Sequence, residues 1–156
     1  MRFEEIYMSQ PFSRCGVVSI NIPTTVTDIP DYAFQECQNL ERVTWHNGIT
    51  QIGEAAFLRC RSLKAITIPT GVTVLRNNLF DECANLQYVT LHHNITEIQV
   101  RAFSYCTLLK SEFFPYEDAY IDRAALPNAL QTLGAGVFTD CKNMESINMQ
   151  RTQVKN

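Results

Sequence analysis

The sequence contains no run of apolar residues long enough to cross a membrane. A membrane-spanning helix needs about 20 consecutive apolar residues, and no segment of the 156-residue chain approaches that length. The opening segment, MRFEEIYMSQPFSRCG, also lacks the apolar stretch of a secretory signal peptide. The expected location is therefore the cytoplasm, with no membrane insertion, or the cell surface if the chain is part of an exported protein.

The sequence also lacks an excess of charge of one sign and the motifs of common active sites. It has 13 basic and 16 acidic residues, and no basic cluster that could follow a phosphate backbone. It contains no glycine-rich phosphate loop, no nucleophile elbow and no metal-ligand motif. We therefore expect no nucleic-acid partner, no enzymatic activity and no cofactor. The length fits one domain with a sizeable core.

The cysteines reveal an internal repeat. Each of the six follows a phenylalanine by three residues, and four of these pairs, from Phe34 and Cys37 to Phe103 and Cys106, recur every 23 residues. Apolar residues such as Leu40, Val43 and Trp45 keep the same phase. Such regularity predicts a solenoid built from stacked copies of one unit. The six pairs are Phe12 and Cys15, Phe34 and Cys37, Phe57 and Cys60, Phe80 and Cys83, Phe103 and Cys106, and Phe138 and Cys141.

The outer copies are less regular than the central ones. The first copy is one residue short, and about a dozen extra residues separate Leu109 from Leu126 relative to a regular unit. The predicted organisation is an N-terminal flank over 1–11, a repeat domain over 12–150 with an insertion near 112–125, and a C-terminal tail over 151–156.

The unit IGEAAFLRCRSLKAITIPTGVT resembles the BspA-type leucine-rich repeat, which reads approximately I-G-x-x-A-F-x-x-C-x-x-L-x-x-I-x-I-P-x-x-V-T. The resemblance implies an α/β solenoid, a right-handed superhelix of about six 23-residue coils. Each coil should contain a short parallel strand and a short helical or 3₁₀ turn. His46 and His92 depart from the pattern, because they stand where it has proline.

In such a solenoid, equivalent residues of successive coils stack at the strand spacing of ~4.8 Å. Alternation along the strand should point Val43 and Trp45 inward and Arg42 and Thr44 outward. We expect the cysteines to be small apolar core residues. Redox or metal chemistry is the less favoured alternative, because stacked cysteines place their Cβ atoms too far apart for a good disulfide and cannot converge on a tetrahedral site.

Two regions are candidates for function. The first is the outward face of the predicted sheet, where the threonines could equally serve to stack the strands and the histidines are expected at the surface. The second is the insertion, whose aromatic residues suit a binding site but could instead fold back over the core. The candidate binding residues are Arg42, Thr44, His46, Thr67, Tyr88, Thr90, His92, Phe113, Tyr116, Asp118 and Tyr120.

These features favour a non-catalytic protein–protein interaction module, with a protein partner whose identity the sequence does not reveal. The alternative is a cell-surface adhesin or matrix-binding segment of a larger exported protein. The resemblance supports this alternative, because proteins with BspA-like repeats include cell-surface binders.

Overall fold

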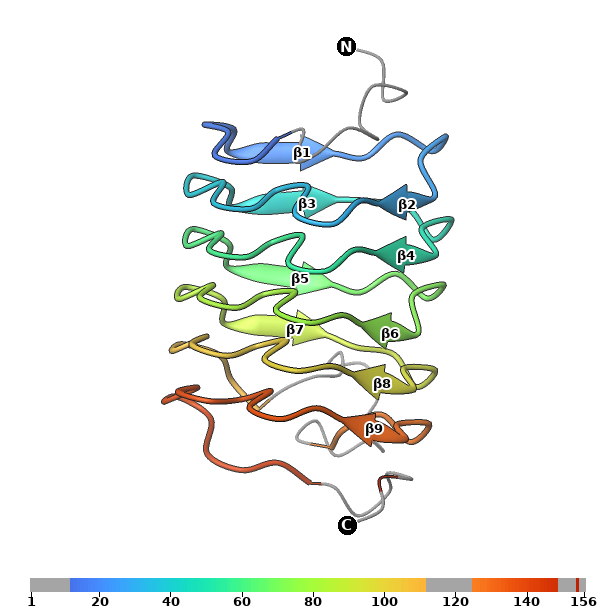
Figure 1. Cartoon of the computed structure of the whole chain (residues 1–156), viewed down its shortest axis with the longest axis vertical. Coiled ribbons are helices and arrows are strands. Elements are labelled where there is room, and N and C mark those ends of the chain that lie inside the picture. Colours follow the sequence, from blue (N-terminus) through green and yellow to red (C-terminus); the bar gives the residue numbers. More distant parts are fainter. Residues whose placement is uncertain (1–11, 112–124, 149–153, 155–156) are drawn as a thin grey trace.

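The computed structural model describes residues 12–111, 125–148 and 154. The chain winds into a stack of coils, with the N-terminal coil at one end of the long axis and the C-terminal coil at the other (Figure 1). Each regular coil has three sides, which we name the long-strand wall, the short-strand wall and the turn wall. All strand pairs are parallel.

The long-strand wall holds the three-residue strands β1 (Ser19–Asn21), β3 (Arg42–Thr44), β5 (Ala65–Thr67) and β7 (Tyr88–Thr90). The short-strand wall holds the two-residue strands β2 (Asp28–Ile29), β4 (Gln51–Ile52), β6 (Val74–Leu75), β8 (Glu97–Ile98) and β9 (Thr132–Leu133). The turn wall carries the Phe-x-x-Cys segments. The predicted solenoid with parallel strands is confirmed.

The prediction of helical or 3₁₀ turns is wrong, because the described residues contain no helix. Two residues of each regular coil have left-handed backbone angles and interrupt any helical path; beside Phe57 they are Ala55 (φ 50°) and Arg59 (φ 61°). The amides therefore point to the next coil. Phe57 N–H donates to Leu79 C=O at 3.0 Å and Arg59 N–H to Asp81 C=O at 2.9 Å, so the turn wall is itself a hydrogen-bonded ladder.

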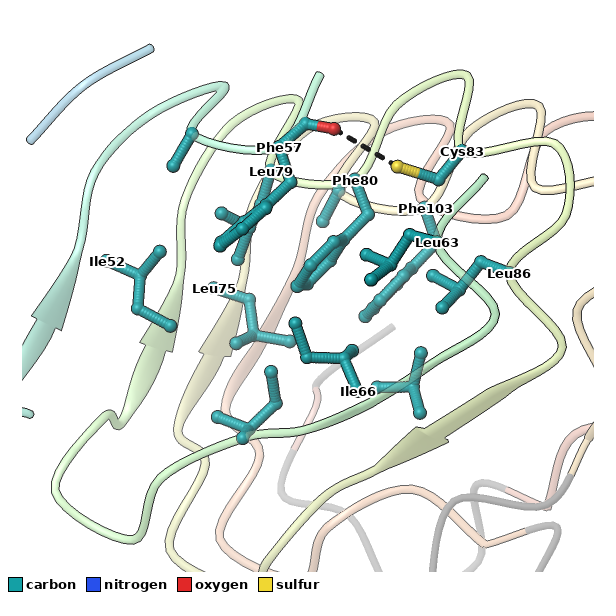
Figure 2. Packing of buried hydrophobic residues seen from close by; sticks show 14 of the residues in the cluster. Ile52, Phe57, Leu63, Ile66, Leu75, Leu79, Phe80, Cys83, Leu86 and Phe103 are labelled. Carbon is teal, nitrogen blue, oxygen red and sulfur yellow. Dashed lines mark hydrogen bonds between the residues drawn. The ribbon is translucent and has the colours of Figure 1, made fainter. Parts of the chain in front are cut away.

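A column of stacked phenylalanines fills the core behind the turn wall. The rings of Phe57, Phe80 and Phe103 lie one above another (Figure 2), and all three are fully buried. Across the whole column, the centroids of successive rings lie 5.2 to 5.8 Å apart. Offset stacking of this kind adds to the energy of simple apolar burial.

The cysteines are free, and all except Cys15 are buried, as the packing argument predicts. The structure adds a hydrogen bond that the sequence did not predict. Each buried thiol donates to the carbonyl of the phenylalanine in the preceding coil, as Cys83 Sγ does to Phe57 O at 3.1 Å (Figure 2). Burial raises the pKa of Cys37 and Cys141 to about 12, which keeps these thiols protonated as donors. The Phe-x-x-Cys spacing thus serves both packing and a hydrogen bond between coils.

The stack contains a discontinuity, which we call the seam, between the coils of β3 and β5. The long-strand wall is divided into the pairs β1–β3 and β5–β7, and the short-strand wall into β2–β4 and β6–β8–β9. The turn wall continues across the seam, where Phe34 N–H donates to Ala56 C=O at 2.8 Å. Two walls are therefore interrupted at the seam while the third wall holds the two parts together.

Trp45 lies at the seam of the long-strand wall. In other coils its position is occupied by the smaller residues Ile22, Ile68 and Leu91, which are buried, whereas Trp45 is half-buried. The edge of its indole contacts Phe57 of the next coil, with ring centroids 5.9 Å apart. Its Nε1–H donates to Thr67 O at 2.7 Å, so a side chain provides the link that strand pairing provides elsewhere.

Candidate interaction surface

The structure brings five of the predicted binding residues together on the outer face of the long-strand wall. Arg42, Thr44, Thr67 and Tyr88 are exposed there, and Thr90 is half-buried. The register pairs Ser19 with Arg42, Ala65 with Tyr88, and Thr67 with Thr90. Each pair is 23 residues apart, as the repeat predicts, so equivalent side chains form columns across the wall.

Tyr88 is held by a lysine from the following coil. Lys110 Nζ donates to Tyr88 Oη at 2.6 Å and lies 4.7 Å from the ring centroid. Such a contact combines a hydrogen bond with a cation–π attraction. A second lysine of the same column, Lys64, is paired with Glu41 at 3.0 Å across the seam. Neither lysine was in the predicted site, although the 23-residue repeat places both at one position beside this wall.

His46 and His92 do not lie on the outer face as predicted. Strand β3 ends at Thr44, so the two-residue alternation no longer directs the side chain at position 46. The half-buried His46 ring instead turns toward the preceding coil, where Nε2 lies 3.0 Å from both Pro23 O and Val26 O. Because carbonyl oxygens only accept hydrogen bonds, Nε2 must carry the proton.

His92 repeats this arrangement two coils further along. Its Nε2 lies 3.0 Å from both Pro69 O and Val72 O. The two rings differ at Nδ1: that of His46 accepts Gly48 N–H at 3.0 Å, whereas that of His92 is buried without a hydrogen-bond partner. Both histidines therefore link consecutive coils, and neither is available as a metal ligand on the sheet face.

The insertion residues Phe113, Tyr116, Asp118 and Tyr120 lie outside the described residues. The chain before the insertion follows the regular path, with Lys110 N–H donating to Gln87 C=O at 3.0 Å. The chain after it rejoins the stack at Ala125, which pairs with Asn148 of the last coil.

A ladder of ion pairs crosses the outside of the turn wall. Glu36 contacts Arg14 at 2.8 Å and Arg59 at 3.2 Å, and Glu82 contacts Arg59 at 3.1 Å and Arg61 at 3.2 Å. The hydrogen bond from Arg14 holds the pKa of Glu36 below its ordinary value. Acidic and basic residues alternate at this repeat position along the sequence, so the ladder could have been predicted from the sequence. Exposed pairs of this kind contribute little to stability.

A shallow groove of about 540 Å³ lies beside this ladder, lined by Arg61, Glu82, Ala84, Tyr105 and Thr107. Among the described residues that line it, the one carboxylate is that of Glu82, which is already paired with two arginines. Within residues 12–111 and 125–148, no group of histidine, cysteine and acidic side chains could hold a metal ion. The same residues contain no helix long and apolar enough to span a membrane.

The comparisons with known proteins agree with this architecture. A model of the BspA type leucine rich repeat region matches six copies over residues 5–125 and 112–156. The fold is that of a leucine-rich-repeat solenoid, and the chain belongs to the BspA-type leucine-rich-repeat family. No curated protein matches the chain.

Several solved structures are similar to this chain. A leucine-rich-repeat protein of T. pallidum superposes with a TM-score of 0.75 and 28% identity, over 87% of this chain and 58% of that one. A leucine rich cell surface protein of Faecalibacterium prausnitzii gives 0.59 and 27%, over 86% and 41%. A leucine-rich-repeat protein of Bacteroides ovatus gives 0.64 and 24%, over 85% and 37%, and this likeness concerns the fold alone. The chain spans less than two thirds of the length of each of these structures.

Proposed function

We propose that the chain is a non-catalytic protein-interaction module that binds its partner on the outer face of the long-strand wall. One observation carries the proposal. The inward position of these strands is always a β-branched apolar residue, namely Ile20, Val43, Ile66 and Val89, whereas the neighbouring outward position is Ser19, Arg42, Ala65 and Tyr88. Packing therefore dictates the inner residues but leaves the outer ones to another role.

The composition of the face supports binding. It combines a flat row of threonines with Tyr88 and Arg42, and tyrosine and arginine are enriched among residues that dominate interface energies. Parallel sheets place such side chains at fixed spacings on a rigid wall, which reduces the ordering cost of association.

The test is affinity capture with a surface variant, Thr44→Arg with Thr67→Arg, which adds bulk and charge in the middle of the face. The matched control, Thr73→Arg with Thr132→Arg, adds the same groups at exposed positions of the short-strand wall. We expect quantitative mass spectrometry to show partners that are lost with the surface variant and retained with the control. Equal recovery with both variants would remove the face from consideration.

The insertion remains a second candidate contact, predicted from its sequence. The double substitution Tyr116→Ala with Tyr120→Ala should weaken capture of the same partner without lowering the melting temperature. A fall in melting temperature instead would assign the two tyrosines to the core, and unchanged capture at unchanged stability would remove the insertion from the binding site.

A surface adhesin segment is the alternative function, and the similarity to the F. prausnitzii cell surface protein favours it. An antibody against the chain should then label intact, unpermeabilised cells of the source organism. Labelling only after permeabilisation would support an intracellular interaction module.

A further inference from the structure

On the long-strand wall, backbone amides that join the regular coils are unbonded at the seam. Ile22 N–H donates to Thr44 O at 2.8 Å, and Gln87 N–H donates to Lys64 O at 2.8 Å. The amides at these two repeat positions beside the seam belong to Trp45 and Lys64. Among the described residues, neither amide donates to a carbonyl of the neighbouring coil. No backbone hydrogen bond between described residues therefore crosses the seam on this wall.

The short-strand wall is interrupted at the same level. Thr50 N–H donates to Thr27 O, and Thr96 N–H donates to Thr73 O, both at 2.8 Å. The amide of Thr73 holds the same repeat position at the seam, but within the described part of the chain it donates to no carbonyl of the coil before it. Both strand walls therefore lose the hydrogen-bond ladder between the same two coils.

Side chains link the two coils on the strand walls. Lys64 contacts Glu41 at 3.0 Å, and Arg76 Nη2 donates to Gln51 Oε1 at 3.2 Å. The indole of Trp45 adds a third link. The side chains of the lysine and the glutamate are 60% and 43% exposed, and exposed ion pairs contribute little to stability. The strand walls are therefore held together only weakly at the seam.

The turn wall is continuous and closely packed at the seam. Phe34 N–H donates to Ala56 O at 2.8 Å, and Glu36 N–H donates to Leu58 O at 2.7 Å. The rings of Phe34 and Phe57 have the shortest centroid separation in the phenylalanine column, 5.2 Å, and the largest interplanar angle, 24°. Two stacks of coils that meet at an angle along the turn wall would produce this combination.

We propose that the seam is a hinge. The coils of β1 and β3 form one rigid unit, the coils from β5 to β9 form the other, and the turn wall is the axis of rotation. The indole of Trp45 holds the hinge closed, because its bond to Thr67 O and its contact with Phe57 both cross the seam. Each coil of a solenoid contacts only its neighbours, so the weakest interface opens while the packed units on either side stay intact.

The hinge divides the outer face of the long-strand wall into two halves. Thr44 belongs to one unit and Thr67 to the other, so opening changes the angle between the halves. The inference does not depend on the proposed function, but it gives the proposed binding face more than one shape. A partner that contacts both halves would shift the hinge toward the shape that it fits.

Paired spin labels on the short-strand wall measure the motion in the intact chain. Thr27→Cys with Thr73→Cys places two labels across the seam, and Thr73→Cys with Gln131→Cys places two labels within one unit. All three positions are exposed and share one repeat position, so each pair spans two coils, or about 10 Å at the strand spacing. Cys15→Ser removes the one native cysteine that is not buried. Dipolar broadening of the electron paramagnetic resonance spectrum reports both separations.

We expect one narrow distribution of separations within the unit and a broader distribution across the seam, with a component at longer separation. Trp45→Phe keeps an aromatic ring but removes the N–H donor, and should raise the longer component by at least about twofold. Trp45→Ile introduces the residue type found at Ile68 and should make the cross-seam distribution as narrow as that of the control pair. A cross-seam distribution that neither variant changes would refute the role of the indole.

Equal distributions for the two label pairs in the parent protein would overturn the hinge. Fraying of the first two coils is the competing explanation for a broad cross-seam distribution, and hydrogen exchange separates the two. A hinge leaves Glu41 N–H bonded to Val18 O, at 2.8 Å in the structure, so this amide should stay protected. Fraying would break that bond. Exchange of the Glu41 amide in proportion to the longer component would therefore refute the hinge.

Discussion

Replacing Phe57 by alanine should lower the free energy of unfolding by roughly 3–5 kcal/mol. Phe57 is fully buried and is stacked between Phe34, with ring centroids 5.2 Å apart, and Phe80, at 5.5 Å. It also supports the indole of Trp45 at the seam. The substitution leaves a cavity that stiff, stacked coils fill poorly, and it removes ring contacts on both sides.

The matched control is Phe12→Ala in the first coil. Phe12 is half-buried and stacks on Phe34 at 5.6 Å. Because the stability of a solenoid is close to a sum of nearest-neighbour terms, the loss at Phe12 should be clearly smaller than at Phe57. Urea unfolding followed by far-ultraviolet circular dichroism measures both. A loss below about 1 kcal/mol at Phe57 would contradict a stacked core.

Three further predictions concern the thiols, the seam and one carboxylate. Cys60 and Cys83 should resist a thiol reagent in the native protein, because burial raises the pKa of both; rapid native labelling would contradict the core assignment. Trp45→Ile should let strands β3 and β5 pair across the seam, so the backbone amide of residue 45 should exchange its hydrogen with solvent more slowly. An unchanged hydrogen-exchange rate would mean that the indole does not cause the seam. Asp81→Asn should raise the free energy of unfolding at pH 7 but not below about pH 4. Desolvation, and then the nearby Glu82, raise the pKa of Asp81 and make its charged form unfavourable. A gain in stability that persists in acid would refute this reasoning.

The direction of the stability change expected for Asp81→Asn follows from the linkage between protonation and folding. A carboxyl whose pKa is higher in the folded state than in the unfolded state binds its proton more tightly when folded. Its charged form therefore destabilises the fold above that pKa, and the penalty disappears once the group is protonated in both states. Asparagine resembles the protonated carboxyl, so the gain is confined to the higher pH range.

The sequence predicts the repeat and the direction of most side chains, because these depend on spacing alone. Val89 is buried while Tyr88 is exposed, as strand alternation requires. The helical turns were wrongly predicted because alanine, phenylalanine and cysteine at near-helical spacing also suit consecutive turns. The left-handed residues that decide between the two, such as Arg59 and Glu82, have no sequence signature of their own.

The candidate site was predicted less well than the fold. The outward positions of the strands were correct, since alternation applies within β3, β5 and β7. His46 and Trp45 lie beyond the end of β3, so strand alternation does not fix the orientation of their rings. Contacts with neighbouring coils fix it instead. The pairing of Lys110 with Tyr88 depends on a tertiary contact that a single unit does not contain.

The contact between histidine and the preceding turn also determines how this solenoid can grow. Proline stands two residues beyond the end of the long strand in the first and third coils, at Pro23 and Pro69. Pro127 holds the same repeat position in the fifth coil, and each proline carbonyl closes the same turn. Histidine takes this position in the second and fourth coils, and its ring binds the proline-containing turn before it. Adding a single proline coil would restore the neighbouring prolines of the repeat pattern but would add no histidine contact, and adding a single histidine coil would place two histidines in neighbouring coils. A duplication that adds a further histidine contact onto a proline-containing turn must therefore copy two coils at a time.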